Sequence, residues 1–233
     1  IKIEEANFFA ADIEDGLLVI TQTMTLDDGT FSKTILKPEF KAEDGKYVAT
    51  VKFDQNADYM FDIKYTDRSG NVYDEYPMDE FTIDKINPVI SVSFDNNTAV
   101  NGDQFKAARK AIITVVEHNF NKNAMNVLVN GNATQVEWIK DENVADTYTA
   151  EVPFPGDALY TFAVNGKDFA DNANSGVTEA AGTVAPWTFT VDKSSPVDLK
   201  ISYEPTFAGT LLEGLTFGFY KAPVTVKIEA TDD

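Results

Sequence analysis

The chain has 233 residues, 43% of them hydrophobic and 12% aromatic, a composition that indicates a globular protein and excludes a disordered, collagen-like or coiled-coil chain. Its 38 acidic and 19 basic residues give a net charge of −19, which repels nucleic acids and anionic lipid headgroups, so we expect no nucleic-acid partner. The sequence contains no cysteine, which excludes disulfides, thiolate catalysis and cysteine-ligated zinc. It has no apolar stretch of about 18 residues, so we expect no membrane insertion.

Short segments in which apolar and polar residues alternate follow one another along the chain, which is typical of strands with one buried face. In chain order, the expected strands are 2–4, 47–53, 59–63, 81–85, 89–94, 148–154, 160–164, 189–193, 197–203 and 224–229. Turn-forming pairs separate them, among them Asp-Gly at 28–29 and 44–45 and Asn-Gly at 101–102 and 130–131. The only helix-like stretch, 105–110, is interpreted as a turn before a strand.

The expected strands recur along the sequence at nearly constant offsets, which is the mark of an internal repeat. The matched segments are 47–53 with 148–154 (101 residues apart), 59–61 with 160–162 (101), 81–85 with 189–193 (108), 5–8 with 117–120 (112) and 2–4 with 227–229 (225). The chain is therefore expected to hold about two periods of a unit of roughly a hundred residues.

Strands of this length and spacing predict an all-β fold of tandem immunoglobulin-like β-sandwich domains with short proline-containing linkers. Tyr59 and Tyr160 stand two residues before Phe61 and Phe162, the arrangement of the tyrosine corner in immunoglobulin-like domains. The two phenylalanines occupy the position at which an antibody domain has a cysteine of its buried disulfide. An apolar ring is therefore expected to fill the core there.

Pro88 and Pro196 each follow a closing strand and indicate the domain boundaries. We expect residues 1–86 to form a repeat that lacks its first strand, 87–194 a complete repeat, and 195–233 the opening strands of a third. Because the linkers are short and contain proline, the domains should form a semi-rigid rod. The exposed edges of the last strands predict that the final segment docks on the second domain or pairs with another chain.

Several of these motifs also resemble a known family. The similar segments are FTIDKINPVISVSFDNN at 81–97, EHNF at 117–120, YTAEV at 148–152 followed by DALYTFAV at 157–164, and KYTDRSGN at 64–71. They resemble the bacterial Ig-like repeats of large Firmicute cell-surface proteins. The resemblance implies an extracellular, cell-wall-anchored protein whose repeats act as a stalk or an adhesive array, with neighbouring repeats as partners and without catalysis. The second repeat, KDFADN at 167–172, departs from the usual Asp-x-x-Gly-Asn turn.

No catalytic, cofactor-binding or metal-binding residue is assigned from the sequence, but three kinds of residue are candidates. His118 is the only histidine and could belong to a Ser-His-Asp triad, although its matched position is Ala6 and a surface position at a strand end is favoured. Acidic turns and the first linker offer hard oxygen ligands for structural Ca²⁺, and β-turns without a metal are the favoured interpretation. These residues are Asp67, Asn71 and Asp74, then Asp168, Asp171 and Asn172, and in the linker Asp84 and Asn87.

Trp138 and Trp187 could form a platform for stacking sugar rings, but their period-two neighbours Val136 and Phe189 favour packing in the core. We therefore expect a structural and adhesive module rather than an enzyme. Two alternatives stay open. One is a binding module for a host glycan or a host protein such as immunoglobulin, and the other is an accessory Ig-like region of a secreted carbohydrate-active enzyme.

Overall fold

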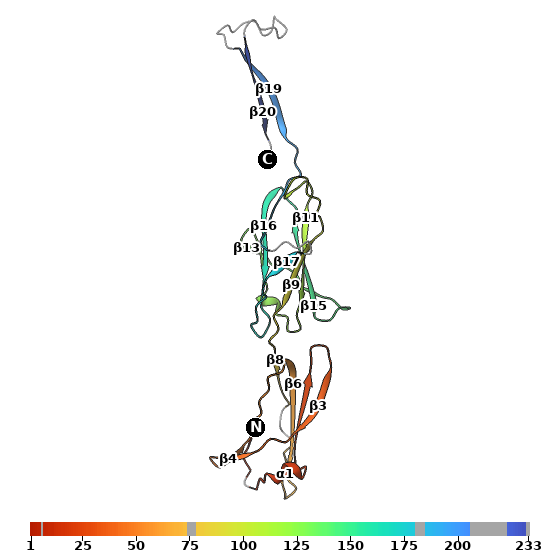
Figure 1. Cartoon of the computed structure of the whole chain (residues 1–233), viewed down its shortest axis with the longest axis vertical. Helices are drawn as coiled ribbons and strands as arrows, with labels where there is room; N and C mark the ends of the chain where they lie inside the picture. Colours follow the sequence, from red (N-terminus) through yellow and green to blue (C-terminus); the bar gives the residue numbers. More distant parts are fainter. Residues whose placement is uncertain (6, 74–77, 180–184, 206–222, 232–233) are drawn as a thin grey trace.

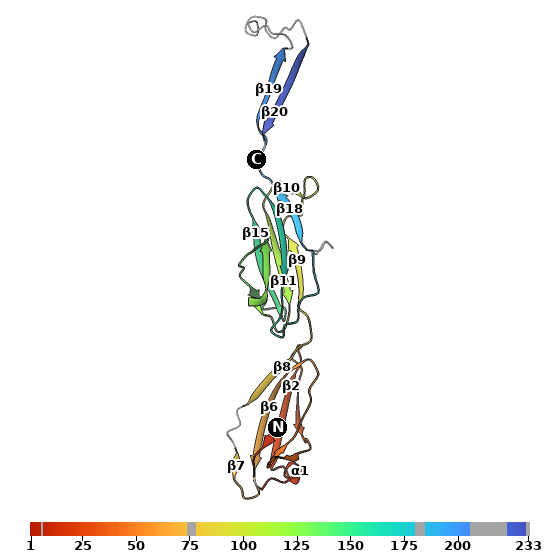
Figure 2. The same cartoon turned by 90° about the vertical axis from the view of Figure 1, so that its left-hand side faces the viewer.

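The computed structural model describes residues 1–5, 7–73, 78–179, 185–205 and 223–231. Regular structure in these residues is almost entirely β-strand, and no helix among them is long and apolar enough to cross a membrane. An N-terminal unit (β1 to β8), a central unit (β9 to β18) and a C-terminal hairpin (β19 and β20) follow one another along the long axis of an elongated molecule (Figures 1 and 2). The expected all-β sandwich fold is confirmed.

The N-terminal unit pairs its strands into two sheets, in the orders β1-β5-β4 and β3-β2-β6-β7, with β8 also paired to β6. Its elements are β1 (Lys2–Ile3), α1 (Ala11–Glu14), β2 (Leu18–Thr25), β3 (Phe31–Leu36), β4 (Lys41–Glu43), β5 (Lys46–Val48), β6 (Ala57–Thr66), β7 (Val72–Tyr73) and β8 (Asp79–Ile83). The longest strands, β2 and β6, pair antiparallel over their full alternating segments.

The central unit is a sandwich of two five-stranded sheets, β10-β18-β16-β12-β13 and β14-β15-β11-β9-β17. Its strands are β9 (Val89–Phe94), β10 (Gln104–Phe105), β11 (Arg109–Val116), β12 (Asn126–Val129), β13 (Asn132–Ala133), β14 (Ile139–Lys140), β15 (Thr147–Phe154), β16 (Ala158–Asn165), β17 (Val177–Glu179) and β18 (Trp187–Val191). A short 3-10 turn covers Lys122–Ala124. The helix-like stretch 105–110 is not helical, as expected: it consists of the end of β10, a bend at 106–107 and the start of β11.

The core of the central unit lies between its two sheets and is built from the inward residues of alternating strands. Phe162, expected at the position where an antibody domain has a disulfide-bonded cysteine, is fully buried. Its ring centroid lies 5.6 Å from that of Phe154. Trp187 is 7% exposed and stacks on Phe162, whereas Trp138 is half-buried against Phe120 at 5.2 Å. The expectation that both tryptophans pack against the core is confirmed.

Both units contain the hydrogen bond of a tyrosine corner. The Tyr160 hydroxyl donates to the Gly156 carbonyl oxygen at 3.1 Å, and the Tyr59 hydroxyl donates to the Gln55 carbonyl oxygen at 3.1 Å. Each bond reaches back four residues and ties the start of a strand (β16 or β6) to the preceding turn. The corner therefore fixes the same bend in both units.

The strand pairing of the two units agrees with the offsets found in the sequence. Ile3 pairs with Tyr47 in the N-terminal unit, as Val115 pairs with Tyr148 in the central unit. Strands β6 and β8 correspond in the same way to β16 and β18, which begin 101 and 108 residues later. These strands therefore pair in the same way in the two units.

A short helix that the sequence did not predict closes the far end of the N-terminal unit. Asp12 in α1 is fully buried and accepts hydrogen bonds from the Tyr65 hydroxyl at 3.0 Å and from Arg68 Nε at 2.8 Å. Its carboxylate also accepts from the Phe9 backbone N–H at 3.0 Å. Because a buried charge must be paired, these three donors hold the helix in place.

The C-terminal hairpin consists of β19 (Val197–Pro205) and β20 (Val224–Thr231), which pair with each other. It extends away from the central unit (Figure 1). The expectation that this segment docks on the second domain is therefore wrong. The apolar residues that docking would bury, Leu199, Ile201 and Ile228, stay exposed.

The core position of Phe162 allows a direct test of the sandwich. Phe162→Ala should lower the free energy of unfolding by about 3–5 kcal/mol, because it leaves a cavity between the sheets. Leu159→Ala, three residues earlier on the same strand and 61% exposed, should change it by less than about 0.5 kcal/mol. Urea unfolding followed by tryptophan fluorescence measures both, and equal losses would contradict the assigned core.

Candidate functional site: the junction between the two units

The segment that leaves β8 is tied to its own unit before it reaches the central unit. The Lys85 backbone N–H donates to Asn56 Oδ1 at 2.8 Å, and Lys85 Nζ donates to the Asp54 carbonyl oxygen. The Asp84 carboxylate accepts from the Ile86 N–H at 2.9 Å. These bonds restrict the linker to one path, so Asp84 is presented to the facing loops of the central unit.

Two asparagines of the central unit donate side-chain hydrogen bonds to Asp84. The Asn119 side-chain amide donates to Asp84 Oδ2 at 2.9 Å, and the Asn172 amide donates to the Asp84 carbonyl oxygen at 3.2 Å. Asn172 is oriented by Asp168, whose carboxylate accepts both its side-chain amide and its backbone N–H at 2.9 Å. The junction is thus a set of directional hydrogen bonds, which fixes orientation better than apolar contact does.

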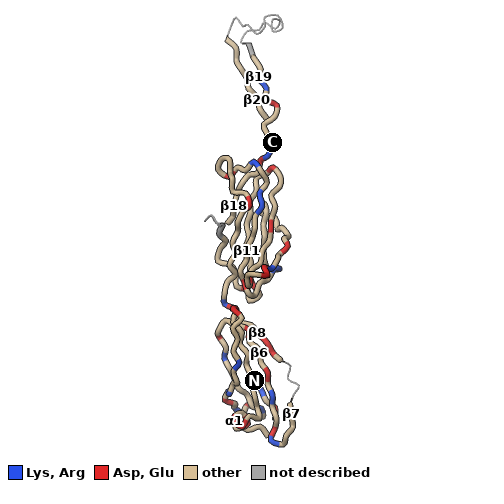
Figure 3. Tube along the Cα trace, turned by 90° about the vertical axis from the view of Figure 1, so that its right-hand side faces the viewer, with Lys and Arg blue, Asp and Glu red and all other residues tan. Residues whose placement is uncertain are grey.

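Three carboxylates meet at this junction. Asp84, Glu117 and Asp168 each offer an oxygen atom, and these three atoms all lie within 4.8 Å of one another. Glu117 and Asp168 are 4% and 2% exposed, and Figure 3 shows acidic positions in red along the chain trace where the two units meet. Hard oxygen ligands at this spacing could hold a Ca²⁺ ion.

The structure brings together only part of the residues that the sequence singled out as possible ligands. Asp84 and Asp168 join at the junction, whereas Asn87 is exposed in the linker. Asp67 closes a turn at the opposite end of the N-terminal unit by accepting the Ser69 and Asn71 N–H groups at 2.8 Å. Of the others, Asp171 is exposed and pairs with Lys167 at 2.8 Å, and Asp74 lies outside the described residues.

Glu117 was missed by sequence reasoning, although a signal for it exists. The motif Glu-x-Asn occurs at Glu5 and again at Glu117, and in both places the asparagine N–H donates to the glutamate Oε1, at 2.9 Å and 2.8 Å. Burial raises the pKa of Glu117, and the nearby Asp84 and Asp168 carboxylates raise it further. The ionised form of Glu117 therefore opposes folding.

His118 bridges the two units beside this acidic group. Its Nε2 lies 3.4 Å from Asp58 Oδ2 on β6, and its Nδ1 lies 3.2 Å from Asp146 Oδ2 in the central unit. Partial burial lowers the pKa of His118, but the hydrogen bonds to Asp146 and Asp58 outweigh it and leave the pKa raised. Because both ring nitrogens face carboxylates, neither is directed at a serine hydroxyl as a catalytic triad requires.

His118 does lie near a strand end, two residues after the last residue of β11, but its ring is half-buried between the units. The matched position, Ala6, lies outside the described residues. No family model and no curated protein matches the chain.

Neutralising Glu117 should stabilise the protein at neutral pH. Glu117→Gln keeps an oxygen acceptor for the Asn119 N–H and removes one buried charge, so its thermal midpoint should rise by a few degrees at pH 7 in EDTA. A raised carboxyl pKa means that the wild type loses stability as pH rises through that pKa, so the gain should vanish in acid.

Glu5→Gln, at the matched position of the N-terminal unit, is the control and should leave the midpoint unchanged. A wild type that is more stable than Glu117→Gln at pH 7 in EDTA would contradict the repulsion between Glu117 and the carboxylates of Asp84 and Asp168. Repeating the melts with excess Ca²⁺ measures whether the three carboxylates hold a cation, because only the wild type would then gain stability.

The charge of His118 should depend on Asp58. Since the chain has a single histidine, NMR gives its pKa without ambiguity. We expect a pKa above 6.5 in the wild type and a lower value in Asp58→Asn, while Asp62→Asn, on the outer part of the same strand, leaves it unchanged.

The sign for stability follows from the raised pKa. Protonated His118 stabilises the junction fully below the pKa of an unfolded histidine, about 6.5, and this contribution is lost as pH rises through the higher folded value. Equal pKa values in the wild type and Asp58→Asn would show that the units do not meet at His118.

Proposed function

We propose that this chain is a non-catalytic, extracellular repeat region of a bacterial surface protein that acts as a stalk or adhesive module. Its domains would be residues 1–86, 87–194 and 195–233, joined by short linkers. Its partners would be the neighbouring repeats. The main support is the junction, which couples two sandwiches through bonds from Asp84 to Asn119 and Asn172.

Each unit carries the same two ends, which is what a repeating rod requires. At the leading end, Glu5 and Asn7 make the hydrogen bond that Glu117 and Asn119 make in the central unit. At the trailing end, the Lys193 N–H donates to Asp157 Oδ1 at 3.1 Å, as the Lys85 N–H donates to Asn56. A further unit could therefore be attached by the same contacts at either end.

The surface chemistry fits exposure to solvent rather than binding of a polyanion. Acidic residues are distributed along both units (Figure 3) and give the chain a net charge of −19. Like charges along a rod repel one another and oppose collapse or lateral aggregation. The absence of cysteine agrees with export from a Gram-positive cell, where disulfides are uncommon.

Small-angle X-ray scattering tests the stalk. A compact globule of this length would have a radius of gyration of about 17 Å, and the wild type should lie well above that value. A value near the compact one would contradict the proposal.

The junction is tested by Asn119→Ala, which removes one bond to Asp84 without changing the charge. It should broaden the distribution of distances between spin labels placed on the two units. Asn7→Ala, at the matched position in the N-terminal unit, should leave the distribution narrow. Equally broad distributions in all three proteins would show that the junction does not restrain the units.

A further inference from the structure

Strand β3 forms one edge of the larger sheet of the N-terminal unit, where it pairs with β2 alone in the described part of the chain (Figure 1). Five of its six residues are exposed. The central unit, with two five-stranded sheets, leaves the same edge open at β13, but β13 has only two residues. Because folded proteins usually keep exposed edge strands short, the longer edge of the N-terminal unit points to a binding role.

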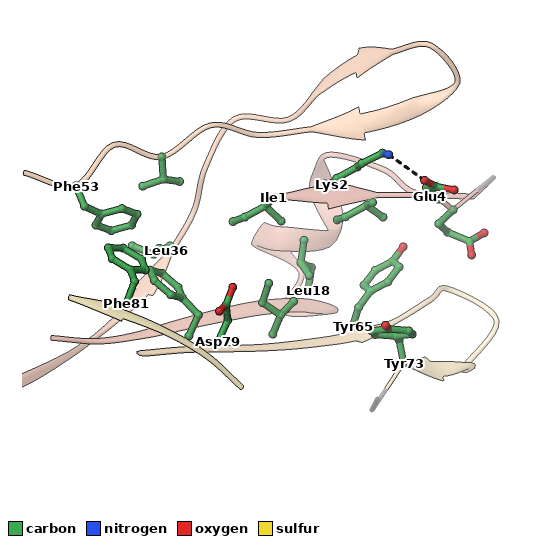
Figure 4. Close-up of a pocket in the computed structure, with 15 residues that line it drawn as sticks. Ile1, Lys2, Glu4, Leu18, Leu36, Phe53, Tyr65, Tyr73, Asp79 and Phe81 are labelled. Atoms are coloured by element: carbon green, nitrogen blue, oxygen red, sulfur yellow. Dashed lines mark ion pairs between the residues drawn. The ribbon is translucent and has the colours of Figure 1, made fainter. Parts of the chain in front are cut away.

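The side chains of β3 alternate between the two faces of the sheet. Leu36 lines the space between the two sheets of the N-terminal unit (Figure 4), so the even-numbered residues of the strand face inward. Phe31, Lys33 and Ile35 lie on the outer face, where Phe31 is 66% and Ile35 60% exposed. The outer face of this edge therefore carries a lysine between two apolar residues.

The same three residues also carry the unpaired backbone groups of the edge. In the hairpin of β2 and β3, the Leu26 N–H donates to the Thr30 carbonyl oxygen at 2.8 Å, which starts the ladder with a hydrogen-bonded pair. Such pairs alternate with non-hydrogen-bonded pairs along an antiparallel ladder, and the register continues without a shift. The N–H and C=O groups of Phe31, Lys33 and Ile35 therefore point away from β2, toward any strand added at this edge.

A second copy of β3 fits this edge poorly. Twofold antiparallel pairing through all three outward residues places Phe31 opposite Ile35 of the second copy, and Lys33 opposite the same lysine of that copy. The apolar residues then match, but two like charges face each other with their Cα atoms about 5.5 Å apart, which is destabilising. Registers that separate the lysines give up at least one of the three pairs. Lys33 therefore disfavours self-pairing.

Lys33 is available to an acidic residue from outside the chain. It is exposed, and it forms no ion pair or side-chain hydrogen bond with any residue in the described ranges. Its neighbours across the outer face are Thr23 on β2 and then Met60 on β6, so the nearest positions in its own row are uncharged. A carboxylate on an added strand would therefore be the first to lie directly opposite it.

We propose that the edge of β3 binds an extended segment of another protein, added antiparallel, with an acidic residue opposite Lys33 and an apolar residue two positions to either side. The backbone groups supply hydrogen bonds, while Phe31, Lys33 and Ile35 select the sequence. Because the contact is limited to one short edge, its area is that of a transient interface. It adds a lateral partner to the proposed stalk and does not depend on the stalk function.

A copy of the chain with Lys33→Glu is the probe, because its own edge then has a carboxylate between Phe31 and Ile35. Adding unlabelled Lys33→Glu to isotope-labelled wild type should shift the NMR amide signals of residues 31, 33 and 35 in a saturable way. Wild type added to wild type, and Lys33→Glu added to itself, should not shift them, since like charges meet in both. A mixed sample without the shift, or equal shifts in all three samples, would overturn the proposal.

Net charge works against the mixed complex, which makes the test specific. The wild type has a net charge of −19, and Lys33→Glu is more acidic still, so long-range repulsion opposes the pairing. Lys64→Glu is the matched control, since Lys64 is exposed on the same outer face but lies on the interior strand β6. This variant should leave the signals of the wild-type edge unchanged. Shifts as large as those caused by Lys33→Glu would refute binding at the edge.

Removing the charge should allow the edge to pair with itself. Lys33→Val places an apolar β-branched residue at the centre of the edge, so sedimentation velocity should show stronger dimerisation than in the wild type. Adding Ile35→Pro should reverse this, because proline removes an N–H that points away from β2 and leaves the hairpin bonds intact. No gain in dimerisation with Lys33→Val would contradict the role of Lys33. A gain that survives Ile35→Pro would show that the dimer does not use this edge.

Discussion

A strand with one apolar face is stable only when a second layer covers that face, and the three parts of this molecule satisfy this requirement to different degrees. The central unit satisfies it with two five-stranded sheets that enclose Phe154 and Phe162. The N-terminal unit satisfies it in part, because its smaller sheet has only three strands and leaves Phe81 39% exposed. The hairpin has no covering layer in the described part of the chain. The same amphipathic pattern therefore produces an enclosed core in the central unit, a partly exposed core in the N-terminal unit and an exposed apolar face on the hairpin.

The junction between the units follows a different principle, since it is polar. Burying carboxylates in a chain of net charge −19 is unfavourable unless neutral or positive donors surround them. Here the Asn119 and Asn172 amides donate to the Asp84 and Asp168 carboxylates, and the imidazole of His118 faces Asp58 and Asp146 beside them. These groups orient the two units relative to each other but supply little positive charge. The carboxylates of Asp84, Glu117 and Asp168 therefore still repel one another. A junction of this kind can be restrained without a large apolar contact, which keeps each sandwich a separate core.

The sequence by itself determined the strands with clear alternation, the tyrosine corners and the burial of Phe162, because alternation and turn residues are local properties that do not depend on neighbouring units. It did not predict β2, β3 or β12. It did not reveal α1, whose four residues are held by the buried contacts of Asp12 with Tyr65 and Arg68. Only the tertiary structure brought Asp84, Glu117 and Asp168 together. These residues are far apart in the chain, and their meeting depends on the path of the linker and on the relative orientation of two separately folded cores.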